Sequence, residues 1–164
     1  MCHKAFKKAF PIRVLDMLRP FHGVDQTLEF LHSQGVAIAV VSCLNMNAIE
    51  MCLTRLRFKD FRYKVHYERT KEECAEPIND LVKNCGVSKK RTVYVGDTLA
   101  DIRMAKKAGV ISVAVKSGAL GQHDPQKLRE ENPDYLLEDF RGLPGVVLRR
   151  EMSENARTSE ADAD

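Results

Sequence analysis

Short apolar runs alternate with amphipathic stretches along most of the chain, and this alternation predicts its secondary structure. Several of the runs are rich in β-branched side chains, which is typical of strands that a parallel sheet buries on both faces. The stretches between them carry apolar residues at helical spacing. This order of elements predicts an α/β fold with a doubly wound, mainly parallel sheet. The expected strands lie at residues 36–41, 65–67, 92–95, 112–115 and 134–137.

Residues with strong positional preferences mark the ends of several expected helices. Gly35 and Gly86 each follow an amphipathic stretch, and glycine commonly terminates a helix. Asn45 precedes another such stretch and has the side chain of an N-cap. Asp124 is followed by Pro125, a pair that favours a helix start. The expected helices span residues 24–34, 46–56, 76–85 and 125–131, and a further helix ends at Gly109.

The segments outside this pattern are expected to be loops and a tail. Residues 58–63 carry aromatic side chains and are interpreted as a loop, and residues 68–73 form a charged loop. From Leu148 to the end, Arg, Glu, Ser, Asp and Ala follow one another without periodicity. This composition predicts a disordered tail over residues 148–164.

The composition excludes several classes of protein. The 164 residues are 44% hydrophobic and 30% charged, which predicts a soluble globular domain. A net charge of +3 is too small to indicate binding to nucleic acid or to a membrane surface. The chain has no apolar run long enough for a membrane span and no secretory signal. Its five cysteines are odd in number and lack Cys-x-x-Cys spacing, so we expect reduced thiols and a cytoplasmic protein.

The candidate chemistry centres on two aspartates that flank a predicted strand-to-helix turn. Asp97 follows the strand 92–95 and Gly96, at the strand end where open α/β sheets bind ligands. Asp101 lies four residues later, on the first turn of the next helix, and faces the same side. Paired carboxylates suit a hard cation such as Mg²⁺. The simpler interpretation is that the two aspartates only cap the helix and interact favourably with its dipole.

This run resembles the fourth motif of the haloacid dehalogenase (HAD) superfamily. The motif is a strand, Gly-Asp, three residues, Asp, and a helix that ends in Ala-Gly; here the helix ends at Ala108 and Gly109. The resemblance implies that Asp97 binds Mg²⁺ directly and that Asp101 completes the coordination or orients a metal-bound water. Thr98 either caps the helix only or also points its hydroxyl at the site.

The same resemblance extends to two phosphate-binding positions. Ser42 ends an apolar strand, as the hydroxyl residue of the second motif does, and would hold a phosphoryl oxygen. The alternative is that Ser42 merely caps the following helix. Lys71 lies within about a residue of the place of the family's lysine, which neutralises phosphoryl charge. The proline that usually follows this lysine is missing, Arg69 is a possible substitute, and a charged loop lysine is often simply solvated.

The opening motif of the superfamily, an apolar strand ending in Asp-x-Asp-Gly-Thr, does not occur in this sequence. Asp16 is the one upstream candidate for the nucleophile, but Leu18 stands where the acid–base aspartate belongs. The turn from Arg19 to Val24 resembles the one that follows the helical cap in capped members. On that alignment residues 1–18 are the end of a cap, residues 19–147 are the Rossmann-like core, and the nucleophile strand precedes Met1.

Within the superfamily the chain resembles the phosphoglycolate phosphatase branch, which has an Asn-Pro-Asp-Tyr stretch like that at residues 132–135. The resemblance implies Mg²⁺-dependent hydrolysis of a small phosphorylated metabolite through an aspartyl-phosphate. Because the nucleophile motif is absent, the alternative is an inactive fragment or a pseudo-phosphatase that binds phosphate or a partner. The cap selects the substrate in this superfamily, so only the substrate class follows. The oligomeric state stays open.

Overall fold

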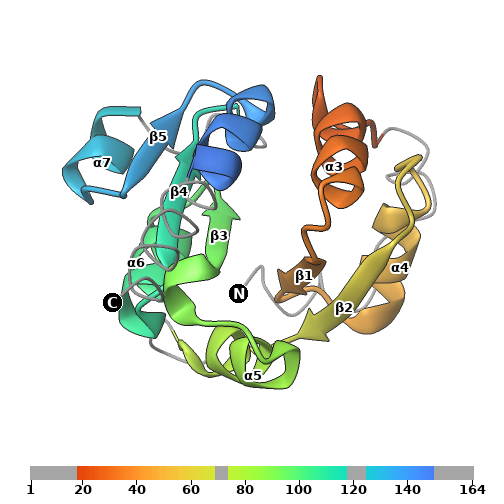
Figure 1. The fold of residues 1–164 in the computed structure, drawn as a ribbon, viewed down its shortest axis with the longest axis horizontal. Helices are drawn as coiled ribbons and strands as arrows, with labels where there is room; N and C mark the ends of the chain where they lie inside the picture. The colour runs from red at the N-terminus through yellow and green to blue at the C-terminus, as the bar shows by residue number, and fades with distance from the viewer. Residues whose placement is uncertain (1–17, 69–73, 118–124, 150–164) are drawn as a thin grey trace, which may run out of the picture. The chain divides into compact units, whose positions relative to one another are not determined.

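The computed structural model describes residues 18–68, 74–117 and 125–149, which belong to two compact units (Figure 1). The division between the units falls between Glu72 and Glu73. Each unit consists of parallel strands with helices, so the α/β fold and the parallel pairing predicted from the sequence are confirmed.

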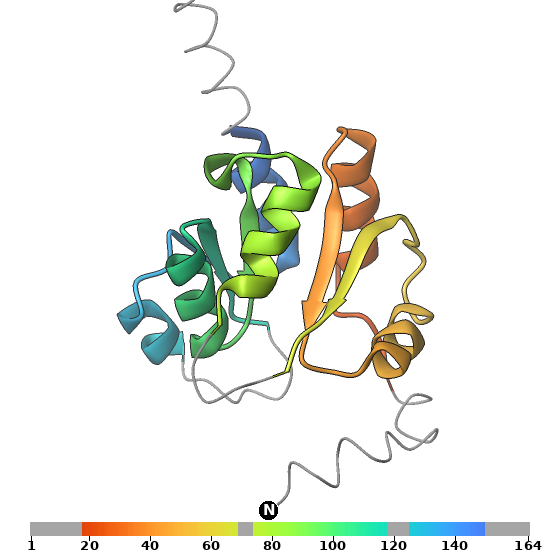
Figure 2. The same cartoon turned by 90° about the horizontal axis from the view of Figure 1, so that it is seen from below.

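The described residues of the first unit form a parallel strand pair and two helices. Strands β1 and β2 run side by side (Figure 2). In their register, Ser42 at the end of β1 is the partner of His66 at the end of β2. Helix α4 packs against β2. The elements are α3 (Val24–Ser33), β1 (Ile38–Ser42), α4 (Met46–Leu53) and β2 (Phe61–His66).

Apolar side chains of α3, of α4 and of the loop before β2 form the buried core of this unit. Leu28 and Leu31 of α3 and Ile49 of α4 are buried. The buried Phe58 ring meets Phe61 and His32 edge-on, at centroid distances of 5.0 and 5.5 Å. Such edge-to-face pairs add to the burial of the rings, and they join α3 to the start of β2.

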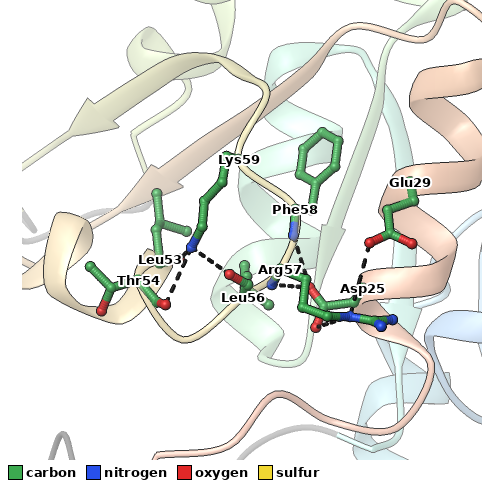
Figure 3. A network of polar contacts seen from close by, with 8 residues as sticks. All are labelled: Asp25, Glu29, Leu53, Thr54, Leu56, Arg57, Phe58 and Lys59. Carbon is green, nitrogen blue, oxygen red and sulfur yellow. Dashed lines mark hydrogen bonds and ion pairs between the residues drawn. The ribbon is translucent and has the colours of Figure 1, made fainter.

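A network of polar contacts fixes the connection between α4 and β2 (Figure 3). The Asp25 carboxylate, on α3, accepts hydrogen bonds from the backbone N–H groups of Arg57 (2.8 Å) and Phe58 (3.2 Å). The Lys59 ammonium donates to carbonyls in and after the last turn of α4, those of Leu53 (2.9 Å) and Thr54 (3.2 Å) among them. Carbonyls at the end of a helix lack donors within the helix, so the ammonium adds to the Leu56 N–H, which the Leu53 carbonyl also accepts at 3.2 Å.

The second unit contains a three-stranded parallel sheet in the order β3-β4-β5. The central strand β4 is buried over its whole length, and α6 packs against both β3 and β4. The elements are α5 (Glu76–Cys85), η1 (Lys89–Arg91), β3 (Val93–Gly96), α6 (Leu99–Ala108), β4 (Ile111–Val115), α7 (Pro125–Glu130), β5 (Tyr135–Leu137) and η3 (Phe140–Gly142). Residues 143–149 are helical.

The core of the second unit contains an apolar cluster and a buried serine that is hydrogen-bonded to an aspartate. Ile102, Ala114 and Leu128 join α6, β4 and α7 in the cluster. The Ser112 side chain is fully buried, and its hydroxyl donates to Asp134 Oδ2 (2.7 Å) and accepts from the Asp134 N–H (3.0 Å). A buried hydroxyl needs such partners, and these bonds fix β4 to the segment that leads into β5.

Several helix ends lie where the sequence predicts them. Helix α5 spans residues 76–85 and ends at Gly86, whose φ of 65° is in the left-handed region that favours glycine. Gly35 has a φ of 80° just after α3, and Asn45 Oδ1 accepts the Ala48 N–H at 2.9 Å as an N-cap. Asp124 lies outside the described residues.

The described strands form one parallel sheet in each unit. The structure differs from the expectations in the bounds of some elements, and α4 ends at Leu53 rather than at residue 56. Strand β2 begins at Phe61, inside the segment that the sequence predicts to be a loop. A strand forms there because Phe61, Tyr63 and Val65 alternate with polar residues at the period of a strand. The helical residues 143–149 include two positions of the expected tail. No helix among the described residues is long and apolar enough to cross a membrane.

Candidate functional site

The carboxyl end of β3 carries the two aspartates that the sequence singles out. Asp97 is half-buried and follows directly on Gly96, the last residue of β3. Gly96 is in register with Ala114 of β4, so this end of β3 is fixed by its neighbour in the sheet. Thr98 is the N-cap of α6, and Asp101 is the third residue of that helix. The turn between strand and helix therefore carries both carboxylates within a few residues.

Asp101 and Thr98 form a reciprocal capping box at the start of α6. The Thr98 hydroxyl accepts the Asp101 N–H (3.2 Å), and Asp101 Oδ2 accepts the Thr98 N–H (3.0 Å). The Thr98 hydroxyl also lies 2.6 Å from Asp101 Oδ2, to which it donates. The carboxylate is thus turned back toward β3, where it also offsets the positive end of the helix dipole.

Gly96 makes this orientation of Asp101 possible. A Cβ atom added at Gly96 would lie 2.2 Å from Asp101 Cβ and 2.6 Å from Asp101 Oδ2, far inside van der Waals contact. The Gly96 backbone is not in the left-handed region, so its need for glycine comes from this close approach. The Asp101 carboxylate therefore lies against the end of β3, next to the position from which Asp97 follows.

Tyr94 also reaches the Asp101 carboxylate, although the sequence analysis gives it no role. Its hydroxyl donates to Asp101 Oδ1 at 3.3 Å, so the two carboxylate oxygens have different hydroxyl partners. Side chains two apart on a strand share a face, which puts Tyr94 on the face where Gly96 has no side chain. This alternation, in a strand directly before Gly-Asp, is the sequence signal that points to Tyr94.

The donor atoms at this end of β3 fit Mg²⁺. They are carboxylate and hydroxyl oxygens, which this cation prefers, and Mg²⁺ is commonly held by one or two carboxylates together with waters. Within residues 18–68, 74–117 and 125–149, no group of three or more His, Cys, Asp or Glu residues gathers as a metal site, so the end of β3 offers two carboxylates and not a larger cluster. The residues that would hold Mg²⁺ here are Asp97 and Asp101.

Ser42 lies in the first unit, at the end of β1. Its hydroxyl oxygen accepts the Leu44 N–H at 3.2 Å, and its carbonyl accepts the Tyr67 N–H at 3.0 Å. A serine hydroxyl both donates and accepts, so the hydroxyl proton stays available for an acceptor such as a phosphoryl oxygen. Asn45, and not Ser42, caps α4.

His66 holds the loop that follows Ser42. Its Nδ1 lies 2.7 Å from the Leu44 carbonyl oxygen, and because a carbonyl only accepts, Nδ1 carries the proton. Since His66 is in register with Ser42, this hydrogen bond ties the turn after β1 to the end of β2. The two bonds to Leu44, from Ser42 and from His66, fix the backbone between Ser42 and Asn45.

The other residues that the sequence singles out, Asp16, Arg69 and Lys71, lie outside the described residues. The structure shows the cap that both interpretations of Thr98 share. Asp101 takes part in the same capping box and its carboxylate lies at the end of β3, while its metal role stays a prediction.

Comparisons with known proteins place the chain among hydrolases. The family model described as haloacid dehalogenase-like hydrolase matches residues 2–115. A phosphoglycolate phosphatase of Pseudomonas syringae pv. tomato is 28% identical over 131 residues, which cover 77% of this chain and 47% of that protein. A pyrophosphatase of Halalkalibacterium halodurans is 27% identical over 135 residues, 80% of this chain and 61% of that protein.

Solved structures share the fold. The crystal structure of a predicted phosphoglycolate phosphatase from Haemophilus somnus 129PT aligns with a TM-score of 0.69 at 24% sequence identity, over 78% of this chain and 57% of that one. The chain spans about half the length of the phosphoglycolate phosphatases that it matches.

Proposed function

Because the chain belongs to the haloacid dehalogenase-like hydrolases, we propose that it acts as a phosphatase on a small phosphate monoester, with Mg²⁺ held by Asp97 and Asp101. The observation that carries the proposal is the close approach of the Asp101 carboxylate to Gly96. It brings possible oxygen ligands of a metal to the end of β3, directly before Asp97. The relationship to phosphoglycolate phosphatases supports a small phosphorylated metabolite as the substrate class.

In this proposal each residue has a separate task. The Ser42 hydroxyl donates to a phosphoryl oxygen, and its backbone is preorganised for this by the bonds to Leu44. Lys71 neutralises phosphoryl charge. The Asp97 carboxylate binds Mg²⁺, and Asp101 binds it too or orients a metal-bound water. Mg²⁺ supplies the positive charge that offsets repulsion between an attacking carboxylate and the phosphoryl group.

The hydrolysis is proposed to pass through an aspartyl-phosphate, as the family resemblance implies. An aspartate carboxylate attacks phosphorus, the alcohol leaves, and water then hydrolyses the acyl phosphate. The sequence contains no Asp-x-Asp-Gly-Thr run, and Asp16 is the upstream candidate for the nucleophile within it. This observation favours one second candidate, a pseudo-phosphatase that binds phosphate without turning it over.

The test is hydrolysis of p-nitrophenyl phosphate by the folded chain, first with Mg²⁺ and then with EDTA. We expect metal-dependent turnover that is lost in Asp97→Asn, because the substitution removes a direct oxygen ligand of Mg²⁺. Asp80, exposed on α5, supplies the matched control Asp80→Asn, which should leave turnover unchanged. Turnover would show a nucleophile within the chain, and Asp16→Asn would then test the upstream candidate.

Absence of turnover from a folded sample contradicts the enzymatic proposal. The second candidate then predicts that the chain still binds inorganic phosphate, measured by calorimetry. Ser42→Ala should weaken that binding, and Ser33→Ala, at an exposed position on α3, should not. Equal binding by all three chains would contradict the role of Ser42.

A further inference from the structure

We propose that Tyr94 is a positioning residue of the metal site, an inference that rests on the proposed metal role of Asp97 and Asp101. Its phenol hydroxyl fixes the one oxygen of Asp101 that still has an acceptor position to offer. The Asp101 carboxylate accepts hydrogen bonds from two elements, the turn before α6 and the strand β3.

A carboxylate offers about four acceptor positions, two on each oxygen. Asp101 Oδ2 uses both of its positions, because it accepts the Thr98 N–H (3.0 Å) and the Thr98 hydroxyl (2.6 Å). Among the residues that the structure describes, Oδ1 accepts a hydrogen bond from the Tyr94 hydroxyl alone, at 3.3 Å. The remaining position is therefore on Oδ1, the oxygen that Tyr94 holds, and this oxygen is the one available to Mg²⁺ or to a metal-bound water.

The backbone explains why Tyr94 reaches this oxygen. Tyr94 and Gly96 lie two residues apart on β3 and share a face of the strand. A Cβ at Gly96 would lie within 2.6 Å of Asp101 Oδ2, so the space that a side chain would fill is taken by the Asp101 carboxylate. The glycine thus brings the carboxylate onto the face of β3 where the phenol lies.

Loss of the Tyr94 hydroxyl should change the metal site without unfolding the chain. Phenylalanine keeps the ring and its packing, and the capping box between Thr98 and Asp101 stays complete. Asp101 is only half-buried, so a water molecule can replace the Tyr94 hydroxyl as hydrogen-bond donor. The position of Oδ1 is then less well fixed. Removal of a group that orients a metal ligand commonly lowers metal affinity 10–100-fold, and for a bond of 3.3 Å we expect about tenfold.

The chain carries its own probe for this test. It has no tryptophan and four tyrosines, so its intrinsic fluorescence comes from tyrosine, and emission from Tyr94 depends on the charge of the carboxylate that its hydroxyl donates to. Mg²⁺ at Asp101 withdraws electron density from that carboxylate. The proposal therefore predicts that Mg²⁺ changes the tyrosine fluorescence through Tyr94.

The experiment titrates the full chain with Mg²⁺ while calorimetry and tyrosine fluorescence are recorded. Wild-type chain, Tyr94→Phe and the matched control Tyr135→Phe are compared, with circular dichroism and urea unfolding as checks of the fold. We expect Tyr94→Phe to bind Mg²⁺ about tenfold more weakly and to lose the fluorescence change, while Tyr135→Phe retains both. Equal affinity in wild type and Tyr94→Phe would overturn the inference and leave the metal role of the aspartates intact.

A second variant covers the case in which Tyr94→Phe fails to fold. A chain in which Tyr63, Tyr67 and Tyr135 are replaced by phenylalanine keeps Tyr94 as its one tyrosine fluorophore. Its fluorescence should still respond to Mg²⁺ at the affinity that calorimetry gives. If the fluorescence of Tyr94 does not change in a chain that binds Mg²⁺, the inference is overturned. A wild-type chain that binds no Mg²⁺ overturns the proposed metal role, and this inference with it.

Discussion

Gly96 is the residue at which the fold and the candidate site depend on each other most closely. The same missing side chain allows the capping box of α6 to close and brings the Asp101 carboxylate to the end of β3. A capping role and a metal-binding role for Asp101 are therefore compatible. The N-terminus of a helix tolerates a carboxylate, and here that carboxylate keeps an acceptor position beyond the hydrogen bonds that cap the helix.

Replacement of Gly96 by alanine should disrupt the start of α6. The new Cβ would lie 2.2 Å from Asp101 Cβ, so the Asp101 side chain or the turn must move. Steric overpacking of this kind costs about 1–3 kcal/mol, and urea unfolding of Gly96→Ala against wild type measures the loss. We also expect Mg²⁺ binding to weaken, because Oδ1 is displaced with the carboxylate.

Gly145→Ala is the matched control for that substitution. Gly145 is exposed within the helical residues 143–149, and a Cβ there meets nothing within 4 Å. Alanine is the better helix former, so the free energy of unfolding should stay equal or rise by up to about 1 kcal/mol. If Gly96→Ala were as stable as Gly145→Ala, the close approach at Gly96 would be contradicted.

At the residue scale, sequence reasoning predicts where the aspartates lie but not how they are held. Asp97 and Asp101 are four residues apart in the sequence. Helix geometry puts side chains at this spacing on one side, so their common side could be expected. The hydrogen bond from Tyr94 depends on how closely α6 approaches β3 at Gly96, and that distance is set by packing in three dimensions. The bond between His66 and Leu44 likewise depends on the register of β1 against β2.

At the scale of elements, α6 and the end of α7 are joined by a charged pair. Arg103 Nε donates to Glu131 Oε1 at 2.8 Å, and the Lys106 ammonium donates to the Glu131 carbonyl. The hydrogen bond from Arg103 lowers the pKa of the Glu131 carboxyl, and the charges of Arg103 and Lys106 lower it further. The pair therefore adds stability that depends on pH.

The direction of that dependence follows from the lowered pKa of Glu131. The contribution is fully present above the ordinary glutamate pKa of about 4.3, and it is lost as the pH falls through the lowered pKa of the folded state. Because both side chains are partly exposed, solvent screening limits the pair to about 0.2–1 kcal/mol. Glu131→Gln should lower the free energy of urea unfolding by that amount at neutral pH and by nothing in acid.

The neighbouring Glu130, exposed on α7, gives the control Glu130→Gln. It should leave the free energy of unfolding nearly unchanged at both pH values. A loss in Glu131→Gln that persists in acid, or that Glu130→Gln reproduces, would count against the charged pair as its cause.

The elements themselves are largely predictable, and the exceptions have local causes. Helix α5 has its expected bounds because an amphipathic stretch ends at a glycine that can adopt a left-handed φ. The start of β2 is an exception: the sequence prediction places a loop over the alternating aromatic and basic residues before Val65, where the structure has a strand. Alternation at a period of two is the signal that identifies this strand.

At the scale of the whole molecule, the five strands of the described residues occur in the predicted order, but their pairing is not predictable from composition. Among the described residues, β1 pairs with β2 alone and β3 pairs with β4 alone, so the strands form two parallel sheets. Periodicity identifies a strand and its faces, and it carries no information on which strand lies beside it. The strand-ending residues Ser42 and Gly96 are nevertheless at the predicted ends of their strands.

The central claim is that the carboxyl end of β3 binds a divalent metal through Asp97 and Asp101. Its most direct test is a calorimetric titration of the folded chain with Mg²⁺, in wild type, Asp97→Asn and the exposed control Asp80→Asn. We expect one binding event that is lost in Asp97→Asn and unchanged in Asp80→Asn, because Asp97 supplies a direct oxygen ligand. Equal binding by wild type and Asp97→Asn, or no binding by folded wild-type chain, would contradict it.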